Sequence, residues 1–218
     1  MRGALLALLA AAAACSPEPR RAFPVGFLEP VSLRVAEESR RQGLELAAQA
    51  PAGAAVVSSA VALKGDGEVA EDWGKLRFLT ARAVAGGAGG VFFRLPSAPA
   101  GRDLLEYVEE WQAIDRVARE LIVMRPILQG GDSAPAPFAV PVGMESRSWT
   151  YQGRRYALLV NASGTSLPLE ERILAPWRAL FAVRSDPRQV LSSCGKDLCL
   201  PAEGVLWLEG RLLPEMLP

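Results

Sequence analysis

The sequence contains no histidine and little lysine, and both absences restrict what the protein can do. Without histidine the chain cannot build an imidazole-based zinc site, a Ser-His-Asp or Cys-His catalytic group, or an imidazole pH switch. Lysine stands only at positions 64, 75 and 196, so arginine supplies almost all the positive charge. Lysine plus arginine equals aspartate plus glutamate at 24 each, and this balance argues against a nucleic-acid partner.

The amino terminus is typical of an export signal. Arg2 is followed by the unbroken apolar run Ala4–Ala14, which is too short to span a bilayer as a mature helix, and Cys15 comes directly after it. This pattern resembles a bacterial lipoprotein signal, although Ala12 stands where leucine is usual. The resemblance implies that Cys15 carries lipid, palmitate included, and anchors the chain to the cell envelope.

Ser16, rather than an aspartate, follows the cysteine. Outer-membrane sorting signals resemble this arrangement, so we expect the protein in the outer membrane rather than the inner one. The alternative is an ordinary secretory leader cut after an Ala-x-Ala site, with Cys15 incidental. In both interpretations residues 1–15 are a signal and the protein leaves the cytoplasm. Residues 16–29 contain proline and too little apolar surface to fold alone, so we predict a flexible tether there.

The sequence offers few residues that could form a metal site or a cofactor site. Cys194 and Cys199 flank a short Gly-Lys-Asp-Leu segment that can bring the two sulfurs together, which predicts a disulfide in an exported protein. Two cysteines without histidine or a second pair leave a tetrahedral ion half coordinated, so we expect no metal. The glycines between Ala85 and Val91 precede a strand rather than open a helix. They are not a dinucleotide fingerprint, and we expect no cofactor.

Residues 30–130 show alternating helix and strand patterns. The clearest stretch, Lys75–Pro96, reads as a helix, a glycine turn and the buried strand Val91–Phe93. Further helices are predicted over 31–42 and 102–128, with Pro126 kinking or ending the second, and strands over 44–50 and 54–63. This alternation indicates an α/β layer with a parallel sheet.

The pattern changes to a period of two after the proline-containing linker 131–137. Trp149–Tyr151 and Arg154–Asn161 read as a hairpin around Gln152-Gly153, and further strands are expected near 166–173, 177–183, 189–193 and 204–209. We therefore predict a small antiparallel β-sandwich over 138–218. Asn161-Ala-Ser163 has the form of a glycosylation sequon, but behind a bacterial leader we expect it to turn the chain.

Several segments together resemble the end of a glycoside-hydrolase-type (β/α)₈ barrel with its trailing β-sandwich. They are Leu76–Ala83, Ala85–Gly90, Val91–Arg94, Glu120–Leu128 and, for the sandwich, Tyr151–Ser163. The resemblance implies an α/β fold with a partial barrel-like layer. About 100 residues cannot supply the eight strands and helices of a roughly 250-residue barrel, so the strands that carry the catalytic acids of the family are expected to be absent.

Candidate ligand-binding residues lie around the predicted helix of the Lys75–Pro96 stretch. Asp66 and Asp72, with Glu68 and Glu71, fall in the loop predicted before this helix, and Trp73 and Arg94 could bind a sugar or a carboxylate. General acid and base catalysis needs two carboxyls about 5–9 Å apart in different environments. The alternative is that the acids favour the positive end of the helix and that Arg94 is an ordinary exposed arginine.

Taken together, these patterns favour a lipid-anchored cell-envelope protein, derived from a glycosidase, that binds or scaffolds without catalysis. The alternative is a glycoside hydrolase acting on glycans with acids in the Asp66–Asp72 loop. About three predicted strands serve three helices, which leaves sheet edges and apolar helix surface unpaired. Either the β-sandwich covers this surface, or a second chain pairs at an exposed sheet edge.

Overall fold

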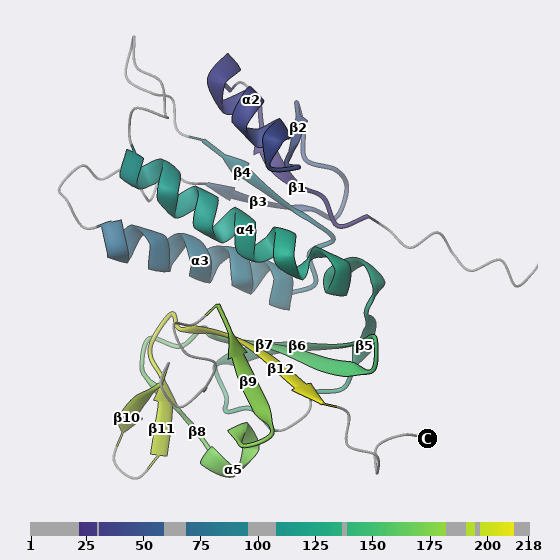
Figure 1. Cartoon of the computed structure of the whole chain (residues 1–218). Coiled ribbons are helices and arrows are strands. Elements are labelled where there is room, and N and C mark those ends of the chain that lie inside the picture. Colours follow the sequence, from purple (N-terminus) through teal and green to yellow (C-terminus); the bar gives the residue numbers. More distant parts are fainter. Residues whose placement is uncertain are drawn as a thin grey trace, which may run out of the picture.

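A computed structural model describes residues 22–29, 31–58, 69–95, 108–136, 139–181, 191–194 and 197–211, and for 69–72, 108–110, 172, 173 and 211 it describes the backbone only. Cys15, Asp66 and Glu68 lie outside these residues. Figure 1 shows a parallel sheet and its helices in the upper half of the molecule and an antiparallel part below them. The α/β class predicted from the sequence is confirmed.

Four strands form the parallel sheet in the order β2-β1-β4-β3: β1 (Val25–Leu28), β2 (Glu45–Ala47), β3 (Ala55–Ser58) and β4 (Val91–Arg94). Every pairing is parallel. All four residues of β1 are buried, which is typical of a central parallel strand. The tether predicted over 16–29 is therefore wrong for its last residues. A four-residue strand behind Pro24 is too short to show a period of its own, and it is buried only in the folded protein, between two neighbouring strands and against the helices.

Three helices accompany this sheet: α2 (Leu33–Arg41), α3 (Val69–Ala85) and α4 (Val108–Gly130). Ser32 caps α2 by accepting a hydrogen bond from the Val35 backbone N–H at 3.2 Å. α3 begins earlier than predicted, so Glu71 and Asp72 belong to a helix and not to a loop. Pro126 lies inside α4 without ending it. Among the described helices, none is long and apolar enough to cross a bilayer.

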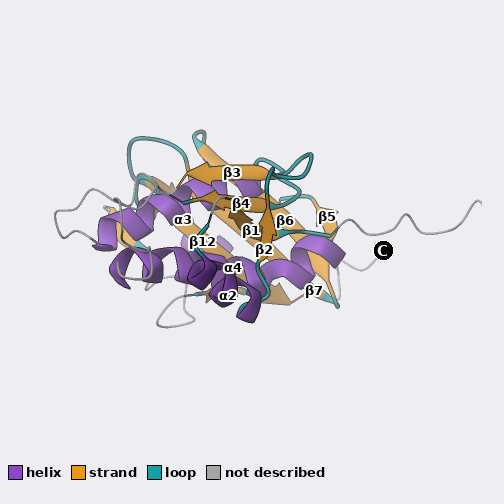
Figure 2. Cartoon of the chain, turned by 90° about the horizontal axis from the view of Figure 1, so that it is seen from above, coloured by secondary structure: helices purple, strands orange, loops and turns teal. Residues whose placement is uncertain are grey.

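The helices pack against one face of the parallel sheet. Side chains alternate along a strand, and Val25, Phe27 and Phe93 belong to the core that also contains residues of α2, α3 and α4. Phe92 and Arg94 of β4 therefore point to the opposite face. Figure 2, seen from above, shows β3 and β4 along one side of this layer and α4 and α2 along the other.

The antiparallel part contains two sheets and one short helix. Their elements are β5 (Asp132–Ala134), β6 (Met144–Tyr151), β7 (Arg154–Asn161), β8 (Leu167–Leu169), α5 (Glu171–Leu174), β9 (Trp177–Leu180), β10 (Ser192–Cys194), β11 (Asp197–Leu200) and β12 (Val205–Arg211). A five-stranded sheet has the order β5-β6-β7-β12-β9 and a three-stranded sheet the order β10-β11-β8. The predicted hairpin is confirmed, with Gln152 and Gly153 both at positive φ in its turn. The predicted linker is wrong at β5, which pairs with β6.

The five-stranded sheet is covered on both faces. One face places Trp149, Leu158 and Trp207 in the same core as α3 and α4. The other face, with Leu159 and Leu206, packs with residues of the three-stranded sheet and α5. The antiparallel part thus covers the apolar surface of the helices, as one of the two sequence-based alternatives proposed.

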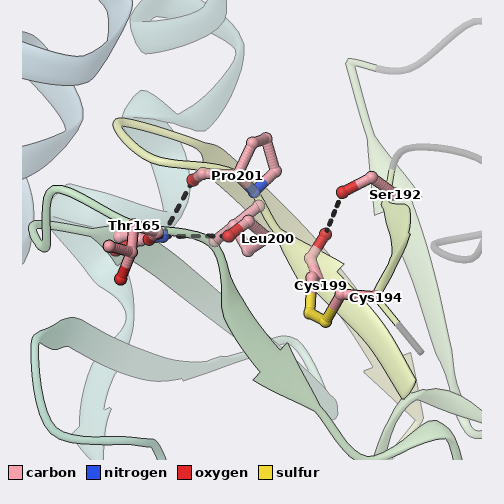
Figure 3. Close-up of a disulfide and its surroundings, with 7 residues drawn as sticks. Thr165, Ser192, Cys194, Cys199, Leu200 and Pro201 are labelled. Atoms are coloured by element: carbon pink, nitrogen blue, oxygen red, sulfur yellow. Dashed lines mark hydrogen bonds between the residues drawn. A yellow bond between two sulfur atoms is a disulfide. The ribbon is translucent and has the colours of Figure 1, made fainter. Parts of the chain in front are cut away.

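The disulfide predicted between Cys194 and Cys199 is present, with the two Cα atoms 5.8 Å apart (Figure 3). It closes the β10–β11 hairpin. Asn161 is fully buried, and its amide donates to the backbone oxygens of Thr165, Leu200 and Pro201 at 2.8–2.9 Å. Asn161 is the last residue of β7, and its Oδ1 accepts a hydrogen bond from the Ser163 backbone N–H at 3.0 Å, so both ends of its amide are engaged inside the protein.

Candidate functional site

Of the ligand-binding candidates singled out in the sequence, the structure describes the side chains of Trp73 and Arg94 only. Asp72 lies in the first turns of α3, where only the backbone is described, and Asp66 lies outside the described residues. Trp73 is partly buried against the helix-side core, and the guanidinium of Arg77 lies 5.5 Å from its ring. Arg94 is exposed at the end of β4, on the opposite face of the sheet. Trp73 and Arg94 are therefore not brought together.

Arg77 instead belongs to a buried ion pair between α3 and α4. Its Nε donates to both carboxylate oxygens of Glu120 at 2.8 and 2.9 Å, and its Nη1 donates to the backbone oxygen of Val205 in β12 at 3.0 Å. The two side chains are only 14% and 11% exposed. Burial raises the pKa of Glu120, and the charge of Arg77 opposes this shift without cancelling it. This pair joins both helices to the five-stranded sheet and is structural.

A different group of charged residues lines a pocket at the edge of the five-stranded sheet. The pocket has a volume of about 470 Å³ and is lined by Arg154, Ala175, Pro176, Trp177, Arg178, Glu209 and Gly210. β9 is the last strand of this sheet, beside β12, and the turn Ala175-Pro176 leads into it (Figure 1). The pocket therefore lies where the first residues of β9 meet the end of β12.

Strand pairing brings the charged groups together. Glu209 in β12 lies directly opposite Tyr156 of β7 and Arg178 of β9, and Arg154 is two residues before Tyr156 on the same face. Arg154 Nη1 donates to Glu209 Oε1 at 2.7 Å, and Arg178 Nη2 donates to Oε2. The Tyr156 hydroxyl donates to Oε1 at 3.2 Å. One carboxylate thus receives hydrogen bonds from two guanidinium groups and a phenol.

The carboxylate of Glu209 is held in its ionised form. Burial is the largest single influence and acts to raise its pKa, but the hydrogen bonds from Arg154, Arg178 and Tyr156 together outweigh burial and lower the pKa. Burial and the charge of Glu209 raise the pKa of Tyr156, which stays a neutral donor. The side chains of Arg154 and Arg178 are 53% and 56% exposed, whereas that of Glu209 is 10% exposed. Two accessible cations therefore face one shielded anion.

Trp177 and Gly210 form another part of the pocket lining. They are paired across β9 and β12, and a Cβ added to Gly210 would come within 3.0 Å of the Trp177 ring. Only glycine lets the indole lie so close to the β12 backbone. Because neighbouring residues alternate between faces, Trp177 belongs to the face opposite Glu209, and residues of both faces meet at the sheet edge.

The described lining of this pocket does not contain the pair of groups that glycoside hydrolysis uses. Hydrolysis needs a pair of carboxyl groups, one of them protonated. Glu209 is the only carboxyl among the described lining residues, and its lowered pKa is opposite to the need of a general acid. Within the described part of the chain, no group of three or more aspartate, glutamate or cysteine side chains is placed to bind a metal ion.

Sequence reasoning missed this site because strand pairing creates it. Arg154, Arg178 and Glu209 come from three strands, and each by itself reads as an ordinary solvent-facing residue in a period-two pattern. Arg154 and Tyr156 do share a face of the predicted hairpin. The order β7-β12-β9, however, joins strands that are distant in the chain, and no local signal predicts it.

Comparisons with known proteins return glycoside hydrolases, the class that the sequence resembles. An α-amylase from Anoxybacillus is 15% identical with a TM-score of 0.38, over 65% of this chain and 32% of its own. A GH30 endoxylanase from Clostridium papyrosolvens is 11% identical with a TM-score of 0.37, over 80% and 44%. A pullulanase from Paenibacillus barengoltzii is 16% identical with a TM-score of 0.41, over 67% and 27%.

The chain spans less than half the length of each of these solved structures. No protein-family model and no curated protein sequence matches it.

Proposed function

We propose that this protein is a lipid-anchored binding module of the bacterial cell envelope that binds a glycan without cleaving it. The observation that carries this proposal is the pocket at the β9–β12 edge, which is lined by Arg154, Arg178 and Glu209 and, from the other face of the sheet, by Trp177. Guanidinium and carboxylate groups hydrogen-bond to sugar hydroxyls, and an indole covers the apolar face of a sugar ring. The single ionised carboxylate supports binding rather than hydrolysis.

We also propose that the parallel sheet is the remnant of a (β/α)₈ barrel. In a closed barrel of eight parallel strands, the first strand lies between the second and the last. The order β2-β1-β4-β3 results if two strands are kept from each end of such a barrel. Residues 48–54 support this origin, because they join β2 to β3 without the helix that normally follows a barrel strand. The missing strands are then the middle ones.

The anchor rests on the leader sequence. If Cys15 is acylated, labelled palmitate is incorporated into the protein, and Cys15→Ser abolishes the label and releases the protein into the soluble fraction. Ser16→Ala is the matched control, which we expect to stay labelled. Unchanged labelling of Cys15→Ser would leave the protein exported but not anchored through this residue.

An interaction through the parallel sheet is also part of the proposal. Each outer strand, β2 and β3, pairs with one strand among the described residues. A second copy of the chain or another protein could add a strand at either edge. Chemical cross-linking on intact cells, followed by mass measurement of the product, distinguishes a dimer from a complex with another protein.

Glycan binding is tested with the purified whole chain and a set of immobilised polysaccharides. We expect retention on at least one of them, loss of retention in Trp177→Ala, and no release of new reducing ends. Trp111→Phe is the matched control, because Trp111 packs near Phe27 on the parallel-sheet side, with ring centroids 5.9 Å apart. Release of reducing ends that Asp66→Asn or Asp72→Asn abolishes would replace this proposal with a hydrolase.

A further inference from the structure

We infer that the ligand of the β9–β12 pocket carries a carboxylate, so that the glycan is an acidic one built with uronic-acid sugars. This inference rests on the proposed glycan-binding function and adds the charge of the ligand. Its basis is the imbalance in the pocket, where the described lining residues contain Arg154, Arg178 and Glu209 as their only charged side chains. Two positive charges against one negative leave one positive charge unbalanced.

The geometry leaves donors available for a ligand. Arg154 and Arg178 each donate to a different oxygen of Glu209 through one terminal nitrogen. A guanidinium has further N–H groups in the same plane, and their natural partner is a planar carboxylate. More than half of each arginine side chain is exposed, so solvent reaches both. Glu209 thus holds one guanidinium group at each of its oxygens, Arg154 from β7 and Arg178 from β9, and both arginines line the pocket.

The net charge of the pocket favours a carboxylate ligand over a phosphate. One unbalanced positive charge matches a single carboxylate, whereas a phosphate monoester carries about −1.5 to −2 near neutral pH and would leave negative charge uncompensated. Trp177 lines the same pocket and offers an apolar surface to the sugar that bears the carboxylate. A uronic acid combines these two features in one ring, which is why we assign this class rather than a neutral or phosphorylated sugar.

The structural alternative is that the two arginines only bridge strands β7, β12 and β9. Direct cross-strand pairs of opposite charge stabilise a sheet modestly, and Arg178 and Glu209 are such a pair. If the two arginines only bridge strands, replacing Arg154 or Arg178 lowers the free energy of unfolding and leaves ligand binding unchanged. Binding and unfolding must therefore be measured on the same variants.

The experiment uses the purified whole chain and calorimetric titration with three probes: a tetragalacturonate, the neutral tetrasaccharide cellotetraose, and glucose 6-phosphate. We expect the uronate to bind at least about tenfold more tightly than either other probe, which is the size of effect that one charge-assisted hydrogen bond gives. The affinity should fall as NaCl is raised, since both arginines are exposed. Arg154→Gln and Arg178→Gln should each weaken uronate binding about tenfold.

Arg119→Gln is the control, because Arg119 is exposed and paired with Asp115 on α4, away from the pocket. Equal binding of cellotetraose and the uronate would overturn the carboxylate but leave the glycan-binding function. Preference for the sugar phosphate would overturn the assigned anion. Absence of binding by every sugar, here and on the polysaccharide set, would overturn the proposed function itself. Arginine variants that unfold more easily yet bind normally would show the bridging role alone.

Discussion

This protein contains two clusters of arginine and glutamate that differ in burial and in charge balance. Arg77 and Glu120 are buried between α3, α4 and β12, one cation to one anion, with a backbone oxygen taking a further donor. Arg154, Arg178 and Glu209 lie at a sheet edge, with two exposed cations to one anion. The pKa of Glu120 is raised and that of Glu209 is lowered. Charge balance and exposure, rather than residue type, distinguish the buried pair from the proposed binding site.

The largest expected effect concerns the antiparallel sheet, which packs against the two helices that carry the buried pair. The antiparallel sheet places Trp149, Tyr156, Leu158 and Trp207 against α3 and α4. At about 1.5–3 kcal/mol for each buried side chain, their loss approaches the whole stability of a domain. We expect residues 22–130 alone to aggregate or to bind a hydrophobic dye, whereas the whole chain unfolds cooperatively. A fragment that is monomeric, cooperative and dye-negative would show that the α/β part is self-sufficient.

How far the sequence could predict the fold depends on whether a segment carries its own period. Helix α2 and the β6–β7 hairpin have clear apolar spacing and turn residues, and both were predicted closely. β1 and β5 were missed because each is very short and is recognisable only through its neighbours. The parallel sheet therefore has one strand more than predicted.

The pocket at the β9–β12 edge shows the same limit at the level of side chains. The disulfide was predictable because Cys194 and Cys199 are close in the sequence. Arg178 and Glu209 are far apart in the sequence and meet only through the β9–β12 pairing. The sequence also suggested Trp73 as a ligand-binding residue, and the structure places it beside Arg77 at the helix-side core.

The second prediction breaks the buried pair. Arg77→Ala or Glu120→Ala leaves an uncompensated charge in a mostly buried place and should lower the free energy of unfolding by about 3–5 kcal/mol. The double variant Arg77→Met with Glu120→Leu removes both charges and fills the volume, so it should cost less than either single change. Urea denaturation measures all three. Asp115→Ala, which breaks the pair with the exposed Arg119 on α4, should cost about 1 kcal/mol or less. Additive costs in the double variant would contradict a coupled buried pair.

The third prediction concerns the disulfide, which lies on the side of the five-stranded sheet away from the helices. A cross-link between residues separated by 5 positions restricts a short loop, and loop entropy then gives about 2 kcal/mol. Replacing Cys194 and Cys199 with alanine should lower the unfolding free energy by that amount and leave uronate binding unchanged. Urea denaturation and calorimetry check the two parts. A loss of binding would connect the β10–β11 hairpin to the pocket.

The smallest expected effect compares the two glutamates directly through pH. The pKa of Glu209 is lowered in the folded protein, so its contribution to stability is present above the unfolded value near 4.3 and is lost as the pH falls through the lower folded pKa. The pKa of Glu120 is raised, so its contribution is fully present below the unfolded value and is lost as the pH rises through the folded pKa. Acidification therefore weakens the fold at Glu209 and strengthens it at Glu120.

Unfolding free energies measured at several pH values between about 3 and 6 should separate the two groups. Glu209→Gln removes the component that is lost in acid, so its stability should fall less steeply than that of the unmodified protein as the pH decreases. Glu120→Gln removes the component of opposite sign, so its stability should fall more steeply. If both variants change the slope in the same direction, the two carboxyls do not have opposite pKa shifts, and the distinction between a structural and a ligand-binding arginine–glutamate cluster loses its electrostatic basis.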